Sequence, residues 1–147
     1  MIAVGSDHGG LELKQAICKF LQDRGLEFSD FGTNDGSSVD YPDFGVKVAK
    51  AVASGDCALG VLICGTGIGM SIAANKVDGI RAALVHDPFT AQMAKEHNNA
   101  NVLVLGGRVL SIEQGCDLVK IWLDSNFESG RHQNRLDKIH QIETDPN

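Results

Sequence analysis

The chain has 147 residues, a net charge of -6 at pH 7 and four cysteines. This length suits one well-buried domain and is short for two, and the acidic balance disfavours nucleic acid or an anionic membrane as the main partner. The cysteines Cys18, Cys57, Cys64 and Cys116 lie far apart, so their spacing predicts neither a zinc knuckle nor a disulfide framework.

The N-terminal residues predict a cytoplasmic protein without a secretion signal. Met1 runs directly into a strand-like segment at 2–4, which leaves no room for the charged and apolar regions of a signal peptide. No apolar stretch approaches the length of a membrane span. Because the chain is acidic and has no run of lysine or arginine, we expect a small-molecule partner.

Strand-like and helix-like segments alternate along the chain. Apolar runs predict strands at 2–4, 27–31, 59–64, 81–85 and 102–105. Apolar residues at helical spacing lie between them, as in Leu13/Ile17/Phe20/Leu21, Phe44/Val48/Ala51/Val52 and Ile112/Cys116/Val119/Leu123. Gly25 predicts a helix end and Asp87-Pro88 a helix start. A final helix is expected after Arg131, with Leu136 and Ile139 on one side.

This alternation predicts an α/β fold in one domain over residues 1–147. The expected architecture is a doubly wound, Rossmann-like parallel sheet of about five strands with flavodoxin-like order, in three α/β/α layers. Such sheets bind ligands beyond the carboxyl ends of their strands, where the strand order reverses. In a flavodoxin-like order that point lies between the first and third strands, which would set Asp7 and His8 beside Cys64.

The segment from Val61 to Ser71 carries the strongest chemical signal. A buried strand ends at Cys64, and a glycine-rich turn leads into a helical pattern at 72–76. A helix N-terminus favours a thiolate over a thiol, and glycines let backbone amides approach an anion closely. Such a loop can hold a base and stabilise an oxyanion.

Several other readings of this loop fit less well. A dinucleotide fingerprint would need glycine, and a phosphatase loop would need arginine, where Met70 stands. A P-loop would need a lysine before Lys76, and a receiver domain would need aspartate in place of Cys64. A packed cysteine at a strand end remains the structural alternative.

Three further sites have two readings each. His97 ends the helix that starts at Asp87, so it should lie at the amino ends of the strands, either as a structural residue or serving a neighbouring subunit. Arg131 and Arg135 share a helix face that suits a phosphate, or form a solvated face with Glu128 beside Arg131. For His86 we favour a structural role at a helix entry over a pocket role.

Six ordered motifs carry a family resemblance. They are S-D-H-G-G at 6–10, D-Y-P-D at 40–43, C-G-T-G-I-G at 64–69, A-A-N-K at 73–76, H-N-N-A-N-V at 97–102 and G-R-H-Q-x-R at 130–135. Together they resemble the type B ribose-5-phosphate isomerases, whose wider family includes galactose-6-phosphate and allose-6-phosphate isomerases. The match covers nearly the whole chain.

The resemblance implies an enzyme of the pentose phosphate pathway that interconverts ribose 5-phosphate and ribulose 5-phosphate through an enediolate. On this reading Cys64 is the base, Thr66 assists proton transfer at the sugar oxygens, and His97 opens the furanose ring. The implied substrate-binding residues are Asp7, His8, Tyr41, Gly65, Gly67, Ile68, Gly69, Asn98, Arg108, Arg131 and Arg135. Of these, His8 and the arginines would hold the phosphate, and the loop amides the enediolate.

The resemblance also implies a homodimer or homotetramer with shared active sites, in which the helix from about residue 131 lies at a subunit interface. No metal or cofactor is expected. The main alternative is an isomerase of a hexose 6-phosphate, allose or galactose. The galactose branch uses two different chains, whereas this chain holds Cys64, His97 and the two arginines together, which favours the pentose. A non-enzymatic nucleotide- or flavin-binding module is the alternative from fold alone.

Overall fold

A five-stranded parallel sheet organises the chain. The computed structural model describes residues 1–146. Its strands are β1 (Ile2–Ser6), β2 (Phe28–Asp30), β3 (Leu59–Cys64), β4 (Ala82–Leu84) and β5 (Val102–Gly106). Every neighbouring pair is parallel, and each strand falls on one of the predicted apolar runs. The predicted doubly wound α/β fold is therefore confirmed.

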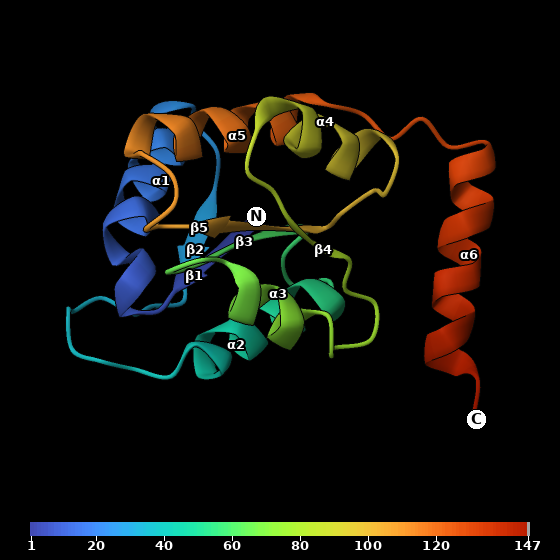
Figure 1. Ribbon diagram of the computed structural model, residues 1–147, viewed down its shortest axis with the longest axis horizontal. Helices are drawn as coiled ribbons and strands as arrows, with labels where there is room; N and C mark the ends of the chain where they lie inside the picture. The colour runs from blue at the N-terminus through green and yellow to red at the C-terminus, as the bar shows by residue number, and fades with distance from the viewer. Residues whose placement is uncertain (147) are drawn as a thin grey trace.

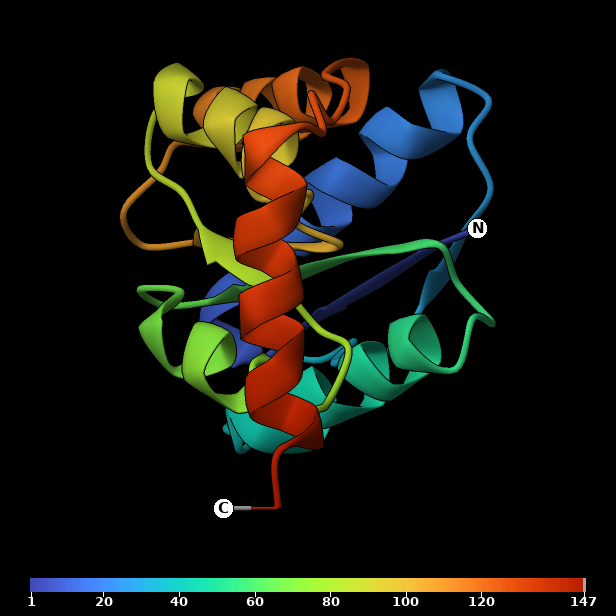
Figure 2. The same cartoon turned by 90° about the vertical axis from the view of Figure 1, so that its right-hand side faces the viewer.

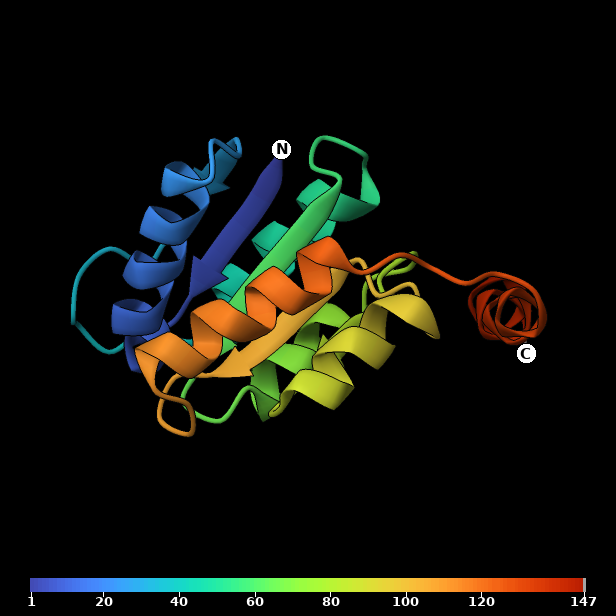
Figure 3. The same cartoon turned by 90° about the horizontal axis from the view of Figure 1, so that it is seen from above.

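Helices cover both faces of the sheet. The helical elements of the chain are the 3-10 turn η1 (His8–Gly10), α1 (Leu11–Asp23), α2 (Tyr41–Ala53), α3 (Ile68–Ala74), α4 (Pro88–Glu96), α5 (Ile112–Asp124) and α6 (Arg131–Thr144). Figure 1 shows α1, α4 and α5 on one face and α2 and α3 on the other, which makes three layers. The last helix, α6, stands beside these layers near β4 and is seen end-on in Figure 3.

The strand order is β2-β1-β3-β5-β4. The reversal between β1 and β3 is where the sequence predicts it. The last two strands are exchanged relative to the flavodoxin-like order, so β5 pairs with β3 and β4 forms the edge. Right-handed crossovers explain the layers, because each step in one direction across the sheet must place its helix on one face. The step from β4 back to β5 therefore puts α4 on the face of α1.

The three central strands are nearly completely buried. β1 and β5 are buried at every position, and β3 at all but its first. One apolar cluster lies under α1, α4 and α5, and a second lies under α2 and α3. In α5 the buried face is formed by Leu118, Val119 and Trp122, whereas Ile112, predicted on that face, is 43% exposed. The indole nitrogen of Trp122 donates to the carbonyl of Ala100 at 3.2 Å, which satisfies the one polar atom of this side chain.

Local signals set most helix ends. The Asp87 side chain accepts a hydrogen bond of 2.7 Å from the Thr90 amide, as expected of an N-cap, and Gly25 adopts a φ of +72° just beyond α1. The helix predicted at 72–76 instead begins at Ile68 and ends at Ala74. Among residues 1–146, no helix has both the length and the apolar character needed to cross a membrane.

Candidate active site

The turn after β3 brings one backbone amide to the thiol of Cys64. Cys64 ends the strand, and Gly67 follows with a φ of +82°, a left-handed conformation suited to glycine. A side chain at Gly67 would also collide with Leu84, since its Cβ would lie 2.4 Å from Cδ1 of that residue. This tight turn lets the Gly67 amide donate a 3.2 Å hydrogen bond to the Cys64 sulfur. The positive end of that amide dipole therefore points at the sulfur.

Loops from both neighbouring strands flank Cys64. On the β1 side, the Asp7 carboxylate accepts hydrogen bonds from the amides of Gly9 and Gly10, which fixes it beside the loop. On the β5 side, the Gly107 amide donates to the Cys64 carbonyl at 2.8 Å and the Arg108 amide donates to the Gly65 carbonyl at 2.9 Å. The guanidinium of Arg108 lies over Gly65, which places a cation next to the loop.

These groups line a cavity of about 450 Å³. Its lining residues are Asp7, Tyr41, Cys64, Gly65, Thr66, Ile68, Gly69, Ile72 and Arg108. The carboxyl edge of the sheet therefore brings together most of the residues predicted to surround Cys64. The strand exchange explains why Arg108 lies here and His86 does not, because β5 and not β4 is the neighbour of β3.

Three side chains at this edge have defined contacts. The Val39 amide donates to Nδ1 of His8 at 3.1 Å, so neutral His8 carries its proton on Nε2. Its Nε2–H is then a donor for an anion. The Tyr41 ring lies against Gly69, where a Cβ atom would come within 2.4 Å of ring carbons. Thr66 accepts a 3.2 Å hydrogen bond from the Ile68 amide through its hydroxyl oxygen.

The remaining predicted site residues lie at the opposite end of the sheet. His97 is the C-cap of α4, five residues before β5 begins, and therefore lies at the amino ends of the strands, as predicted. Strand β3 has six residues and spans about 17–20 Å, which separates His97 from Cys64 within one chain. Asn98 lines another cavity, of about 240 Å³, between β4 and α6. Arg131 and Arg135 are exposed in the first turns of α6.

The sequence did not predict that His132 and Glu128 lie beside His97. His132 is buried and stacks on His97 with ring centroids 4.2 Å apart. The Glu128 carboxylate faces both rings and not Arg131, the partner considered above, at 3.5 Å from Nε2 of His132 and 3.9 Å from Nε2 of His97. The four-residue spacing of Glu128 and His132 was the only local signal for this cluster.

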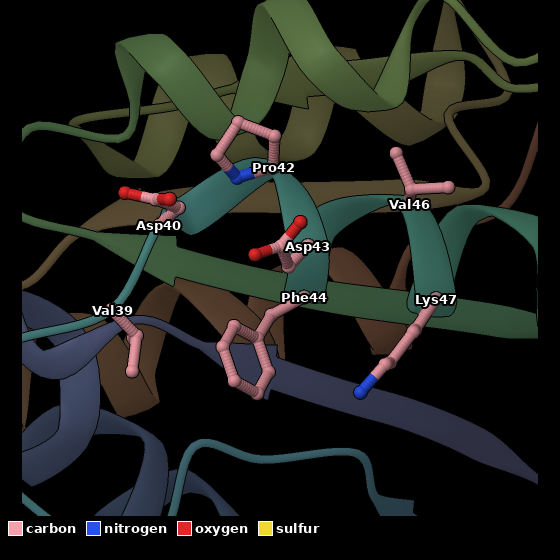
Figure 4. Close-up of a pocket in the computed structure, with 7 residues that line it drawn as sticks. All are labelled: Val39, Asp40, Pro42, Asp43, Phe44, Val46 and Lys47. Carbon is pink, nitrogen blue, oxygen red and sulfur yellow. The ribbon is translucent and has the colours of Figure 1, made fainter.

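A larger hollow lies on the flank of α2 and is not the candidate site. It measures about 720 Å³ and is lined by residues of the segment 39–47, drawn in Figure 4. Asp40 and Asp43 would repel a phosphate there, and Lys47 lies over the Phe44 ring at 5.1 Å. No thiol or imidazole lines this hollow among the described residues.

The other cysteines sit in environments unlike that of Cys64. Burial raises the pKa of the Cys18 thiol to about 11, and the nearby Asp30 carboxylate adds to this effect. Burial likewise raises the pKa of Cys116. Cys57 is buried in the cluster under α2 and α3. None of these three cysteines lines the cavity that contains Cys64.

Comparison with known proteins places the chain in a family. The family model described as Ribose/Galactose Isomerase matches residues 2–139. The chain belongs to this family. Among ribose/galactose isomerases, ribose-5-phosphate isomerase B of Escherichia coli is 47% identical over 97% of this chain and 95% of its own length.

Solved structures of the ribose/galactose isomerase family share the whole fold. The Clostridium thermocellum ribose-5-phosphate isomerase B is 54% identical, with a TM-score of 0.97 over 99% of each chain. The Mycoplasma genitalium ribose-5-phosphate isomerase B, solved with bound ribulose-5-phosphate, is 44% identical, with a TM-score of 0.95 over 98% of this chain and 96% of its own.

Proposed function

We propose that the chain interconverts ribose 5-phosphate and ribulose 5-phosphate, with Cys64 as the base. The observation that carries this proposal is the Cys64 thiol, which accepts a hydrogen bond from the Gly67 amide inside a cavity that also holds Asp7 and Arg108. Membership of the ribose/galactose isomerase family and the names of the similar proteins support it. Phosphorylated sugars are charged and do not cross bilayers unaided, which favours a cytoplasmic location.

The first step opens the furanose ring, and we assign it to His97. The imidazole takes the proton of the anomeric hydroxyl, and the electron pair of that O–H bond forms the C1 carbonyl. The C1–O4 bond breaks, its electron pair stays on O4, and His97 returns the proton to O4. Both oxygens are bonded to C1, so one imidazole nitrogen can serve both.

The second step moves a proton between carbons through an enediolate. The Cys64 thiolate takes the proton from C2 of the open aldose and returns it to C1, while Thr66 assists transfer between the two sugar oxygens. Residues 65, 66, 68 and 69 line the cavity, and we assign the amides of this loop to stabilising the enediolate. A general base contributes about 10²- to 10⁴-fold, and one oxyanion donor contributes about 3–4 kcal/mol, so the amides matter as much as the thiol.

Substrate binding divides between the two ends of the sheet. Asp7 and Tyr41 hold the sugar beside Cys64, and the Nε2–H of His8 and the Arg108 guanidinium offer donors to the phosphate. Asn98 would hold a sugar hydroxyl, and Arg131 and Arg135 would complete the phosphate site. Because these last residues lie at the amino ends of the strands, we propose a homodimer or homotetramer in which a neighbouring subunit supplies them, with α6 at the interface.

A direct isomerisation assay tests this function. Purified protein is mixed with ribose 5-phosphate and formation of ribulose 5-phosphate is followed by proton NMR, with allose 6-phosphate and galactose 6-phosphate as parallel substrates. We expect the highest kcat/KM for ribose 5-phosphate. A preference for either hexose phosphate would overturn the pentose assignment, and no turnover of any of the three, together with a co-purifying nucleotide or flavin, would favour a binding module.

A further inference from the structure

Two stacked imidazoles share one carboxylate at the amino end of the sheet. The rings of His97 and His132 lie 4.2 Å apart with 16° between their planes. Glu128 places one oxygen, Oε2, 3.5 Å from Nε2 of His132 and 3.9 Å from Nε2 of His97. Both rings therefore direct the same nitrogen toward the same carboxylate oxygen.

The backbone fixes this arrangement. The Glu128 amide donates to the Glu96 carbonyl at 3.0 Å, which ties the segment after α5 to the end of α4 next to His97. Ser129 and Gly130 then turn with positive φ, and the His132 amide donates to the Ser129 carbonyl at 3.2 Å. This turn returns the chain so that His132 lies under His97. The His132 side chain is 9% exposed, whereas that of His97 is 39% exposed.

The geometry does not suit a shared metal ion, although two histidines and a glutamate are a common zinc ligand set. Zinc lies about 2.0–2.1 Å from an imidazole nitrogen, close to the plane of the ring. An ion in the plane of His97 would lie well outside the nearly parallel plane of His132. The cluster therefore fits a role in orienting imidazoles.

We propose that Glu128 is a positioning residue for His97, with His132 as the surface on which the His97 ring rests. A carboxylate facing Nε2 favours the neutral tautomer that carries its proton there, which leaves the Nδ1 lone pair free. The stack holds the ring plane, so Nδ1 points in one direction and takes the anomeric proton in ring opening. This inference rests on the proposed function, because His97 acts there as the ring-opening base.

The test combines kinetics with the tautomer of His97. The Glu128→Gln variant keeps the size of the side chain and removes its charge. We expect its kcat for ribose 5-phosphate to fall about tenfold with KM within about twofold of wild type, because substrate binding does not depend on the carboxylate. In ¹⁵N-detected spectra at pH 8, where an ordinary imidazole is neutral, wild-type His97 should carry its proton on Nε2 and the variant should show a mixture of tautomers.

Control variants separate positioning from folding. Glu113→Gln removes an exposed carboxylate from α5 and should leave both readouts unchanged. Glu128→Asp keeps the charge one methylene further away and should recover part of the lost kcat. An unchanged kcat, or an unchanged His97 tautomer, in Glu128→Gln would overturn the inference. If the wild-type protein does not turn over ribose 5-phosphate, the proposed function fails, while the tautomer measurement still decides whether Glu128 orients the His97 ring.

Discussion

The amide nitrogen of Gly67 lies 3.2 Å from the sulfur of Cys64 and donates a hydrogen bond to it. No such donor to the sulfur of Cys18, Cys57 or Cys116 is found among residues 1–146, and burial holds the pKa of Cys18 at about 11 and raises that of Cys116. We therefore expect iodoacetate at pH 8 to modify Cys64 first, as measured by peptide mass spectrometry.

Protection and pH provide the controls for this labelling. Ribulose 5-phosphate should slow modification of Cys64 and leave the other three thiols unaffected. Because the raised pKa keeps folded Cys18 as a thiol until about pH 11, its labelling should increase only as the pH rises toward that value, or on unfolding. Equal labelling of all four cysteines at pH 8 would show that Cys64 is an ordinary buried thiol.

Gly69 is expected to be required for the position of Tyr41. A Cβ atom at Gly69 would lie 2.4 Å from the Tyr41 ring, which is 39% exposed, so we expect the new methyl group to displace the ring. We expect Gly69→Ala to lower kcat/KM about fivefold, while stability changes by less than about 1 kcal/mol because alanine also favours the helix. Steady-state kinetics and a thermal melt measure the two effects. Gly36→Ala, with no atom within 4 Å of the new methyl group, is the matched control and should change neither.

Arg131 is expected to act in phosphate binding. One charge-assisted hydrogen bond contributes about 1.5–3 kcal/mol, so Arg131→Ala should raise KM about ten- to a hundredfold with a smaller change in kcat. Lys138→Ala removes an exposed cation from the same helix and serves as the control. A wild-type KM in Arg131→Ala would show that Arg131 lies on a solvated helix face and does not bind the phosphate. Unphosphorylated ribose should be a poor substrate of the wild-type protein.

The shared site predicts complementation between two inactive variants. Cys64→Ala and His97→Ala each remove one group, but a mixed dimer keeps one site with both groups intact. Random exchange makes half of the dimers mixed, each with one of two sites active, so recovered activity should approach about a quarter of wild type. Native mass spectrometry would confirm the exchange. Mixed dimers without activity would show that Cys64 and His97 do not act in one site.

Lys14 is expected to hold the segment 30–41, in which the Val39 amide contacts His8 and Tyr41 lines the cavity. Its side chain is fully buried, and Nζ donates to Asp30 at 2.6 Å and to Asn34 at 2.9 Å. Removing one partner of a buried ion pair costs about 3–5 kcal/mol, and the 30% exposure of Asp30 reduces this, so we expect Lys14→Met to lower the free energy of unfolding by about 2–3 kcal/mol. Urea denaturation measures the loss. The double variant Lys14→Met/Asp30→Asn should recover part of it, and equal stabilities of the single and double variants would count against the ion pair.

The parts of the fold that sequence could predict depend on local physics. The central strands are runs of apolar residues. The Asp87 side chain caps α4 by accepting a hydrogen bond from a backbone amide, and Gly25 adopts the left-handed conformation that follows the end of α1. The placement of His97 followed from the direction of a crossover helix alone. Each of these predictions depends on a few neighbouring residues or on the general rule that a crossover helix returns to the amino ends of the strands.

Other features depend on contacts that no local pattern contains. The exchange of β4 and β5 depends on which strand reaches β3, and it decides that Arg108 enters the cavity. The apolar spacing of α5 included Ile112, but the buried face is set by how Trp122 packs under the helix layer. The stack of His132 on His97 joins the end of α4 to the start of α6, and the tight turn at Ser129 and Gly130 creates it.

Figure 1 shows α6 at the side of the molecule beyond β4, and Figure 2 shows it crossing in front of the sheet from the level of one helix layer to that of the other. On the proposed scheme, each chain carries two half-sites, one with Cys64 at the carboxyl end of the sheet and one with His97 at the amino end. If copies joined head to tail, the assembly would extend into a fibre, and the chain at each end would keep one incomplete half-site. A two-fold pair closes on itself and leaves neither half unmatched. Catalysis would then depend on protein concentration. Dilution below the dissociation constant of the dimer should abolish activity while the chains remain folded.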